Sequence, residues 1–130
     1  RMTDEIGPRA LGNQSILAPP FQVSTRVRLN EIKQREKFRP IAPVCLEEVA
    51  EKWFGCDQAS PFMLFTHRVR TNELAAVTHV NGTARVQTVS SVTNRNLYEL
   101  LIAFKARTGH GVLCNTSLNF NLKGFINKIK

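Results

Sequence analysis

Four basic side chains fall within seven positions of the segment 33–39, which reads KQREKFR and is followed by a proline. In an extended chain, residues two apart point to the same side, so Lys33 and Arg35 could face one anion together. The same segment could instead form a solvated charged surface, with Glu31 and Glu36 as ionic partners. The apolar run at 41–46 holds the segment near a core, and it favours the anion-binding interpretation.

A cluster of small polar residues reads NTSLN at 115–119, directly after the apolar run 112–114. Ligands gather at the carboxyl ends of strands in α/β sheets, and the side chains of Ser117 and Asn119 hydrogen-bond readily to phosphate and carbonyl oxygens. Ordinary turns use the same residue types. The pattern alone leaves both interpretations open.

Two further arginines lie in segments that could approach a ligand. Arg9 belongs to the glycine-punctuated stretch GPRALG at 7–12, which lacks the Lys and Ser or Thr that complete a P-loop. Arg9 could still donate a bidentate pair of hydrogen bonds to a phosphate or carboxylate. Arg85 lies within a strand-like run at 84–89, where its side chain either faces solvent or reaches a pocket.

No metal site is predicted. The three histidines are far apart in the sequence and are expected to be structural: His67, His79 and His110. The three cysteines form no C-x-x-C pair and are expected to be small buried residues in a reducing cytosol: Cys45, Cys56 and Cys114.

The elements that would position these residues belong to a mixed α/β or α+β fold. Apolar residues at helical spacing predict helices at 45–54 and 94–107, each followed by a glycine stop, and a thinner stripe predicts a third at 24–35. Short apolar runs predict strands at 62–65, 75–80, 84–89 and 112–114. Asn81-Gly82 predicts a type I′ hairpin turn with positive φ at both residues.

Composition supports one compact domain over residues 1–130. The chain is 42% hydrophobic and has 18 basic and 10 acidic residues, which gives a net charge of +8. No apolar run approaches the ~20 residues that span a bilayer, so no membrane partner is expected. The basic residues are spaced singly, which favours convergence on one pocket over a charged tail.

Four ordered segments together carry a family resemblance: EIGPRALGNQSIL at 5–17, IKQREKFRPIAP at 32–43, AVTHVNGTARVQT at 76–88 and LCNTSLN at 113–119. They resemble the C-terminal region of the carbamoyltransferases that include nodulation protein NodU and the antibiotic O-carbamoyltransferases. That region is similar to the YrdC-type fold, a twisted open mixed sheet flanked by helices. The YrdC signature pairs K-x-R with a later S-x-N, which are residues 33–35 and 117–119 here.

The resemblance implies a cytoplasmic domain that binds ATP and carbamoyl phosphate and forms carbamoyl adenylate for transfer to a hydroxyl acceptor. It implies a longer protein whose N-terminal actin-like ATPase-type domain, with its own metal, lies outside this chain. Mg²⁺ is expected with ATP. Lys33, Arg39 and Arg85 are the implied catalytic residues. All residues implied to bind the nucleotide and carbamoyl phosphate are Arg9, Lys33, Arg35, Arg39, Arg85, Ser117 and Asn119.

Two departures from the family pattern concern the pocket walls. Gln14 stands where the family usually has Arg, and the segment after Asn119 lacks the usual V-x-G-E-P-type continuation. The main alternative is a basic module that binds double-stranded RNA. A structural interaction domain with a degenerate pocket is a third. Most aromatic residues are needed by the predicted helices, so few are left to stack on bases, and nucleic acid is not the expected partner.

Overall fold

A computed structural model describes residues 7–119. Its main sheet has four strands in the order β1-β6-β2-β5, with β6 antiparallel to both neighbours and β2 parallel to β5. A separate antiparallel pair joins β3 and β4. The elements, in chain order, are β1 Ser15–Ala18, α1 Val23–Ile32, β2 Ala42–Leu46, α2 Glu47–Phe54, β3 Thr66–Arg68, β4 Thr83–Arg85, β5 Gln87–Val89, α3 Arg95–Thr108 and β6 Val112–Ser117. The open mixed sheet with helices confirms the predicted mixed α/β class.

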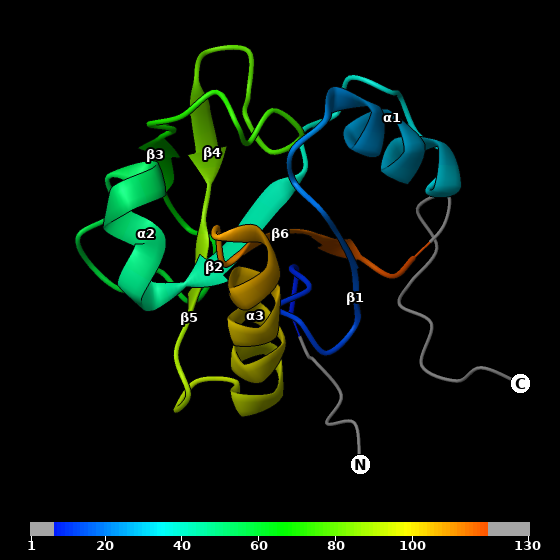
Figure 1. Cartoon of the computed structure of the whole chain (residues 1–130). Coiled ribbons are helices and arrows are strands. Elements are labelled where there is room, and N and C mark those ends of the chain that lie inside the picture. The colour runs from blue at the N-terminus through cyan, green and yellow to red at the C-terminus, as the bar shows by residue number, and fades with distance from the viewer. Residues whose placement is uncertain (1–6, 120–130) are drawn as a thin grey trace, which may run out of the picture.

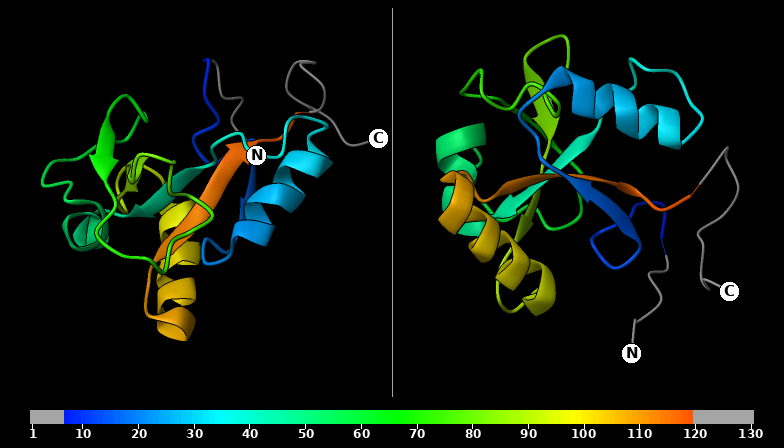
Figure 2. Two further views of the ribbon diagram at one scale, coloured as in Figure 1. Left: turned by 90° about the horizontal axis from the view of Figure 1, so that it is seen from above. Right: turned by 45° about the vertical axis from the view of Figure 1, so that its right-hand side comes forward.

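Figure 1 shows α1 and α2 at opposite sides of the molecule, with α3 between them, and Figure 2 gives two further views. The core between the sheet, α2 and α3 includes Leu46, Phe54, Leu101 and Val112, all fully buried. Because β6 runs through the centre of the sheet, its carboxyl end emerges near the end of α1 (Figure 1). This arrangement brings the two candidate segments, 33–39 and 115–119, together.

The two strongly amphipathic helices are confirmed. Asn94 caps α3 by accepting a hydrogen bond from the Leu97 N–H at 3.1 Å, and Gly109 ends the helix in the left-handed conformation at φ 80°. Helix α2 ends at Gly55, which has φ 58°. The prediction began α2 two residues early, because Cys45 and Leu46 belong to β2 and the chain turns directly from strand into helix.

Several strand predictions are wrong. The runs 62–65 and 75–80 form no strand. The first is a loop that leaves Phe62 and Phe65 exposed. The second consists of turns in which Val77 is buried, and the Ala76 N–H donates a hydrogen bond to the Pro20 carbonyl at 3.0 Å. The run 84–89 divides at Val86 between β4 and β5, which belong to different sheets.

The Asn81-Gly82 turn forms, but it is not type I′. His79 accepts from the Gly82 N–H at 2.9 Å and donates to the Thr83 carbonyl at 2.7 Å, and Gly82 alone of the Asn-Gly pair has positive φ, at 75°. A three-residue turn followed by a glycine bulge needs positive φ only at the glycine. The predicted location is therefore confirmed and the predicted turn type is wrong.

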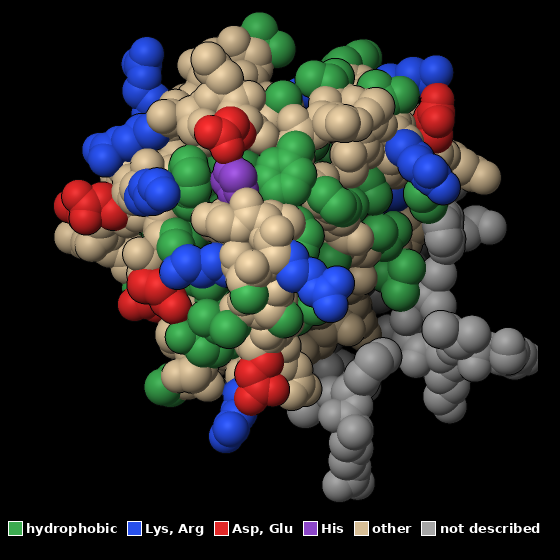
Figure 3. Space-filling model, viewed as in Figure 1, with side chains coloured by type: hydrophobic (Ala, Val, Ile, Leu, Met, Phe, Trp, Pro, Cys, Tyr) green, Lys and Arg blue, Asp and Glu red, His purple; other side chains and the backbone are tan. Residues whose placement is uncertain are grey.

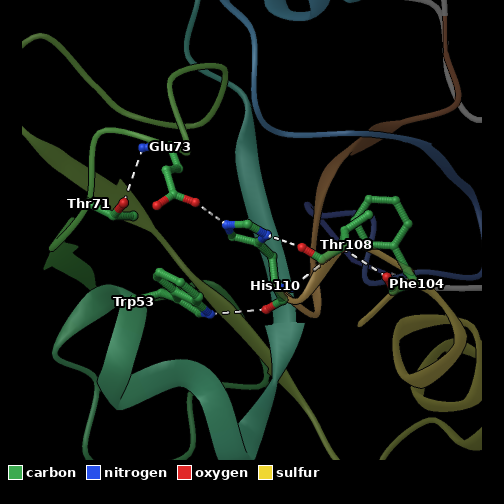
Figure 4. Close-up of polar contacts among 6 residues, drawn as sticks. All are labelled: Trp53, Thr71, Glu73, Phe104, Thr108 and His110. Atoms are coloured by element: carbon green, nitrogen blue, oxygen red, sulfur yellow. Dashed lines mark hydrogen bonds and ion pairs between the residues drawn. The ribbon is translucent and has the colours of Figure 1, made fainter. Parts of the chain in front are cut away.

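His110 has the structural role expected of it (Figure 4). Its ring stacks on Trp53 with centroids 4.9 Å apart, and its ring nitrogens lie 2.7 Å from the Thr108 carbonyl and 2.5 Å from the Glu73 carboxylate. The Trp53 indole N–H donates to the His110 carbonyl at 3.0 Å. These contacts join α2, the 71–76 loop and the end of α3.

The cysteines are also as expected, since all three thiols are buried and unpaired. Burial raises the pKa of the Cys114 thiol to about 12. Cys56 lies with its sulfur 3.6 Å from the His67 ring. Within residues 7–119, no group of three or more His, Cys, Asp or Glu side chains gathers as metal ligands would.

Candidate anion-binding site

The basic segment begins where α1 ends. Helix α1 stops at Ile32, three residues before the predicted end, in a Schellman motif: the Arg35 N–H donates to the Asn30 carbonyl and the Gln34 N–H to the Glu31 carbonyl, both at 3.0 Å. The left-handed position of the motif is Gln34, with φ 53°. The segment is thus a tight helix termination, and the expectation of an extended chain at Lys33 and Arg35 is wrong.

Lys33 nevertheless reaches the polar cluster at the end of β6. Its side chain is buried, and Nζ donates to Ser117 Oγ at 2.9 Å and Asn119 Oδ1 at 2.6 Å, as well as to the Ser117 carbonyl. The Ser117 hydroxyl in turn donates to Asn119 Oδ1 at 2.6 Å. The K-x-R and S-x-N segments, which are more than 80 residues apart in sequence, therefore meet through direct hydrogen bonds.

The lysine ammonium has no carboxylate partner in this cluster. Burial, with a smaller contribution from the charge of Arg35, lowers the pKa of Lys33 to about 8. Arg35 is itself perturbed, because burial and the nearby charge of Arg39 lower its pKa, although Glu36 partly offsets the effect. The site thus concentrates positive charge beyond what its own acidic residues neutralise.

A cavity of about 240 Å³ opens over this cluster. Arg39 stands at its wall, with its side chain about half exposed and its Nε 2.9 Å from the Glu36 carboxylate. The complete lining is Lys33, Gln34, Arg35, Glu36, Arg39, Ser117 and Asn119. An anion entering here would meet three cations and one already paired carboxylate.

A second cavity of about 130 Å³ adjoins the first and shares Arg35 and Ser117 with it. Arg9 and Arg85 line it, and burial together with the charge of Arg9 lowers the pKa of Arg85. The Arg85 Nε is buried without a hydrogen-bond partner among the described residues. All seven predicted site residues therefore line one or both of two neighbouring cavities.

The structure adds one residue that the sequence did not indicate, Met63, and brings Asn115 of the polar cluster to the same cavity. Met63 and Asn115 line the second cavity, and both are buried. Met63 has φ 54°, so the two non-glycine residues with positive φ in the described chain, Gln34 and Met63, both line these cavities. Backbone strain of this kind persists where surrounding structure enforces it, often at functional sites.

Gln14, one of the departures from the family pattern, lies beside the same segment. It is buried, and its carbonyl accepts a hydrogen bond from the Leu118 N–H at 2.9 Å. The substitution therefore falls next to the polar cluster of β6. The other departure, after Asn119, lies outside the described residues.

Comparison with known proteins agrees with this geometry. A sequence profile described as Carbamoyltransferase C-terminus matches residues 1–130. The chain belongs to this family. It is 60% identical over 126 residues to a 3'-hydroxymethylcephem-O-carbamoyltransferase of Amycolatopsis lactamdurans, and this match covers 96% of the chain and 24% of that protein. It is also 45% identical over 124 residues to Nodulation protein U of Rhizobium tropici, and this match covers 93% of the chain and 22% of that protein.

This family membership confirms the resemblance drawn from the four segments. The chain spans about a quarter of the length of these curated relatives. None of the helices between residues 7 and 119 is long and apolar enough to span a bilayer.

Proposed function

We propose that this carbamoyltransferase-family domain binds Mg·ATP and carbamoyl phosphate in the two adjoining cavities and forms carbamoyl adenylate. One observation carries the proposal: five cations from three separate segments converge on cavities that share Arg35 and Ser117, and Glu36 is their one carboxylate among the described residues. Two phosphorylated substrates, one of which supplies the carbamate that attacks the other, suit two cationic cavities with a common wall.

The reaction needs positioning and charge stabilisation more than a side-chain nucleophile. Atom balance requires carbamoyl phosphate to lose its phosphate to water, which leaves carbamate. A carbamate oxygen then attacks the α-phosphorus of ATP, and the bond to pyrophosphate breaks as the new O–P bond forms. Negative charge grows on the phosphoryl oxygens and the leaving pyrophosphate, where guanidinium and ammonium groups stabilise it.

The residues have distinct parts in this proposal. Lys33, Arg39 and Arg85 stabilise the reacting phosphoryl group, and Arg9 and Arg35 hold the phosphates, because guanidinium groups bind them in bidentate fashion. Ser117 and Asn119 hydrogen-bond the nucleotide phosphates after releasing Lys33. Mg²⁺ arrives with the triphosphate as part of the substrate, since the one carboxylate of the lining is already paired with Arg39.

The rest of the reaction is assigned to the remainder of the polypeptide. The relatives named as O-carbamoyltransferases support a hydroxyl acceptor, and their greater length supports an N-terminal domain that transfers the carbamoyl group. The three buried unpaired thiols suit a reducing cytosol.

The test is calorimetric titration of the chain with Mg·ATP, with and without carbamoyl phosphate, beside an RNA duplex. The Arg39→Ala variant should lose nucleotide affinity. Arg95→Ala is a matched control, because Arg95 forms a similar exposed ion pair on α3, with Nε 2.9 Å from the Glu99 carboxylate. Carbamoyl-phosphate-dependent exchange of labelled pyrophosphate into ATP, measured in the full-length polypeptide, tests the adenylation step itself.

Binding of RNA alone, weakening steeply with salt, would instead support the nucleic-acid alternative. The face that bears α3 gives the nucleic-acid alternative little support, because its Lys and Arg side chains are scattered and mixed with acidic ones instead of forming a continuous basic surface (Figure 3).

A further inference from the structure

Asn30 is a fully buried polar residue in the last turn of α1, beneath the basic segment. Its side-chain Nδ2 donates to the carbonyls of Lys37 and Arg39, at 3.0 and 2.9 Å. Its Oδ1 accepts from Arg35 Nε at 2.6 Å. Every hydrogen of the amide is thus used, and all three bonds go to the segment that carries the site cations.

The first pair of bonds determines the path of the loop. Residues 33–40 contain no regular element, and the side chains of Lys37 and Arg39 are about two-thirds and half exposed. After the Schellman motif, the loop has one turn bond, from the Arg39 N–H to the Glu36 carbonyl at 3.1 Å, and exposed ion pairs of Lys37 and Arg39, which contribute little to holding one conformation. The two Asn30 N–H bonds tie its main chain to the buried side of α1, and they set where the Arg39 side chain leaves the backbone.

The third bond orients Arg35. Its Nε is anchored to Asn30, and the guanidinium makes no other hydrogen bond to residues 7–119. The two terminal nitrogens are therefore left for an anion at the wall shared by the cavities. A guanidinium held at Nε loses less freedom when an anion binds than an unrestrained one does.

We propose that Asn30 is a positioning residue for the anion site, which aims Arg35 and fixes the 37–39 main chain without touching the ligand. This inference rests on the proposed function only in that the cavities bind a phosphate-type anion. An aspartate could not replace it, because a carboxylate has no N–H for the two carbonyls and would neutralise Arg35.

The test combines affinity for inorganic pyrophosphate with a direct view of the Arg35 side chain. In Asn30→Ala, affinity should fall about tenfold, because one well-oriented charge-assisted contact is lost. Against an Arg35→Ala background, the same substitution should cost clearly less than tenfold, because the part that acts through Arg35 is already lost and only the part that acts through the 37–39 main chain remains. In ¹H–¹⁵N spectra, the Arg35 Nε–H signal, assigned by its loss in Arg35→Lys, should exchange slowly with water in the parent and rapidly in Asn30→Ala.

Val112→Ala provides the stability control, because Val112 is fully buried in the core and lines neither cavity. It should destabilise the chain while pyrophosphate affinity and the Arg35 signal stay unchanged. Affinity within twofold of the parent in Asn30→Ala, or an unchanged Arg35 signal, would overturn the proposal. If the chain binds pyrophosphate but the full-length polypeptide catalyses no carbamoyl-phosphate-dependent exchange, the proposed function would be refuted and the role of Asn30 would stand.

Discussion

Anion binding at this site should weaken as the pH rises through about 8, because Lys33 loses its charge there. Lys33 is 5% exposed and its ammonium group is surrounded by neutral oxygens of Ser117 and Asn119. Burial, with a smaller contribution from the charge of Arg35, lowers its pKa to about 8. A phosphate needs the ammonium form, and a bound anion would keep that form protonated to a higher pH.

The size of the effect follows from the titration of one group. With a pKa of about 8, the protonated fraction falls from about 0.9 at pH 7 to about 0.1 at pH 9, so the affinity should fall about tenfold. Calorimetry with ATP measures it, and sulfate serves as a second probe because its charge is constant over this range. Lys33→Arg should bind with nearly constant affinity, since arginine stays protonated.

The reasoning would be refuted if the anion affinity of the parent changed less than twofold between pH 7 and 9, or if the affinity of Lys33→Arg fell as much as that of the parent. Folding stability gives an independent check. Because the folded-state pKa lies below the unfolded value of 10.5, the unfolded chain binds more protons between about pH 8 and 10.5. The contribution of Lys33 to stability should therefore rise with pH across that window, and chemical denaturation of the parent and of Lys33→Met would show the difference.

Three further substitutions separate binding from stability. Arg39→Ala should weaken nucleotide binding about tenfold and nearly abolish adenylate formation in the full-length polypeptide, while urea titration shows stability within about 0.5 kcal/mol of the parent, because its ion pair with Glu36 is exposed. Gln34→Gly should raise the unfolding free energy by about 1 kcal/mol, measured by urea titration, because it removes a side chain from the left-handed position at φ 53°. Asn94→Ala should lower the unfolding free energy by about 1 kcal/mol through loss of the α3 cap, and calorimetry should show unchanged ATP affinity.

The helices could be predicted because periodicity, caps and glycine stops agree along 47–54 and 95–108. Only part of the central sheet could: β6 and β5 overlap the runs predicted at 112–114 and 84–89, but β1 and β2 were not predicted. Strand β2 contains Pro43, which argues against a central strand because it lacks an N–H. The structure accommodates Pro43 because the pairing of β2 with β5 begins only at Val44. Pro43 therefore pairs with one strand only, β6, where it lies opposite Cys114. That arrangement depends on where a distant strand ends, which local sequence does not show.

The candidate site, like the fold, could be predicted from the sequence only in part. Charge and spacing indicated the basic segment and the polar cluster but left a solvated surface and ordinary turns open as alternatives, and the family resemblance assigned the site residues. Asn30 and Met63 were missed because each lies in a segment that reads as ordinary helix or loop, and their roles arise from burial beside the cations. Residues that support a site leave a weaker local signal than residues that would touch the ligand.

The cations also perturb one another, and this favours a bound anion. The charge of Arg35 lowers the pKa of Lys33, that of Arg39 lowers the pKa of Arg35, and that of Arg9 lowers the pKa of Arg85, each in addition to burial. Assembling these like charges costs folding free energy in the empty site. An anion at the shared wall of the cavities relieves the repulsion at several cations at once. Binding a multiply charged phosphate should therefore stabilise the fold more than a singly charged anion of equal size, which thermal unfolding can measure.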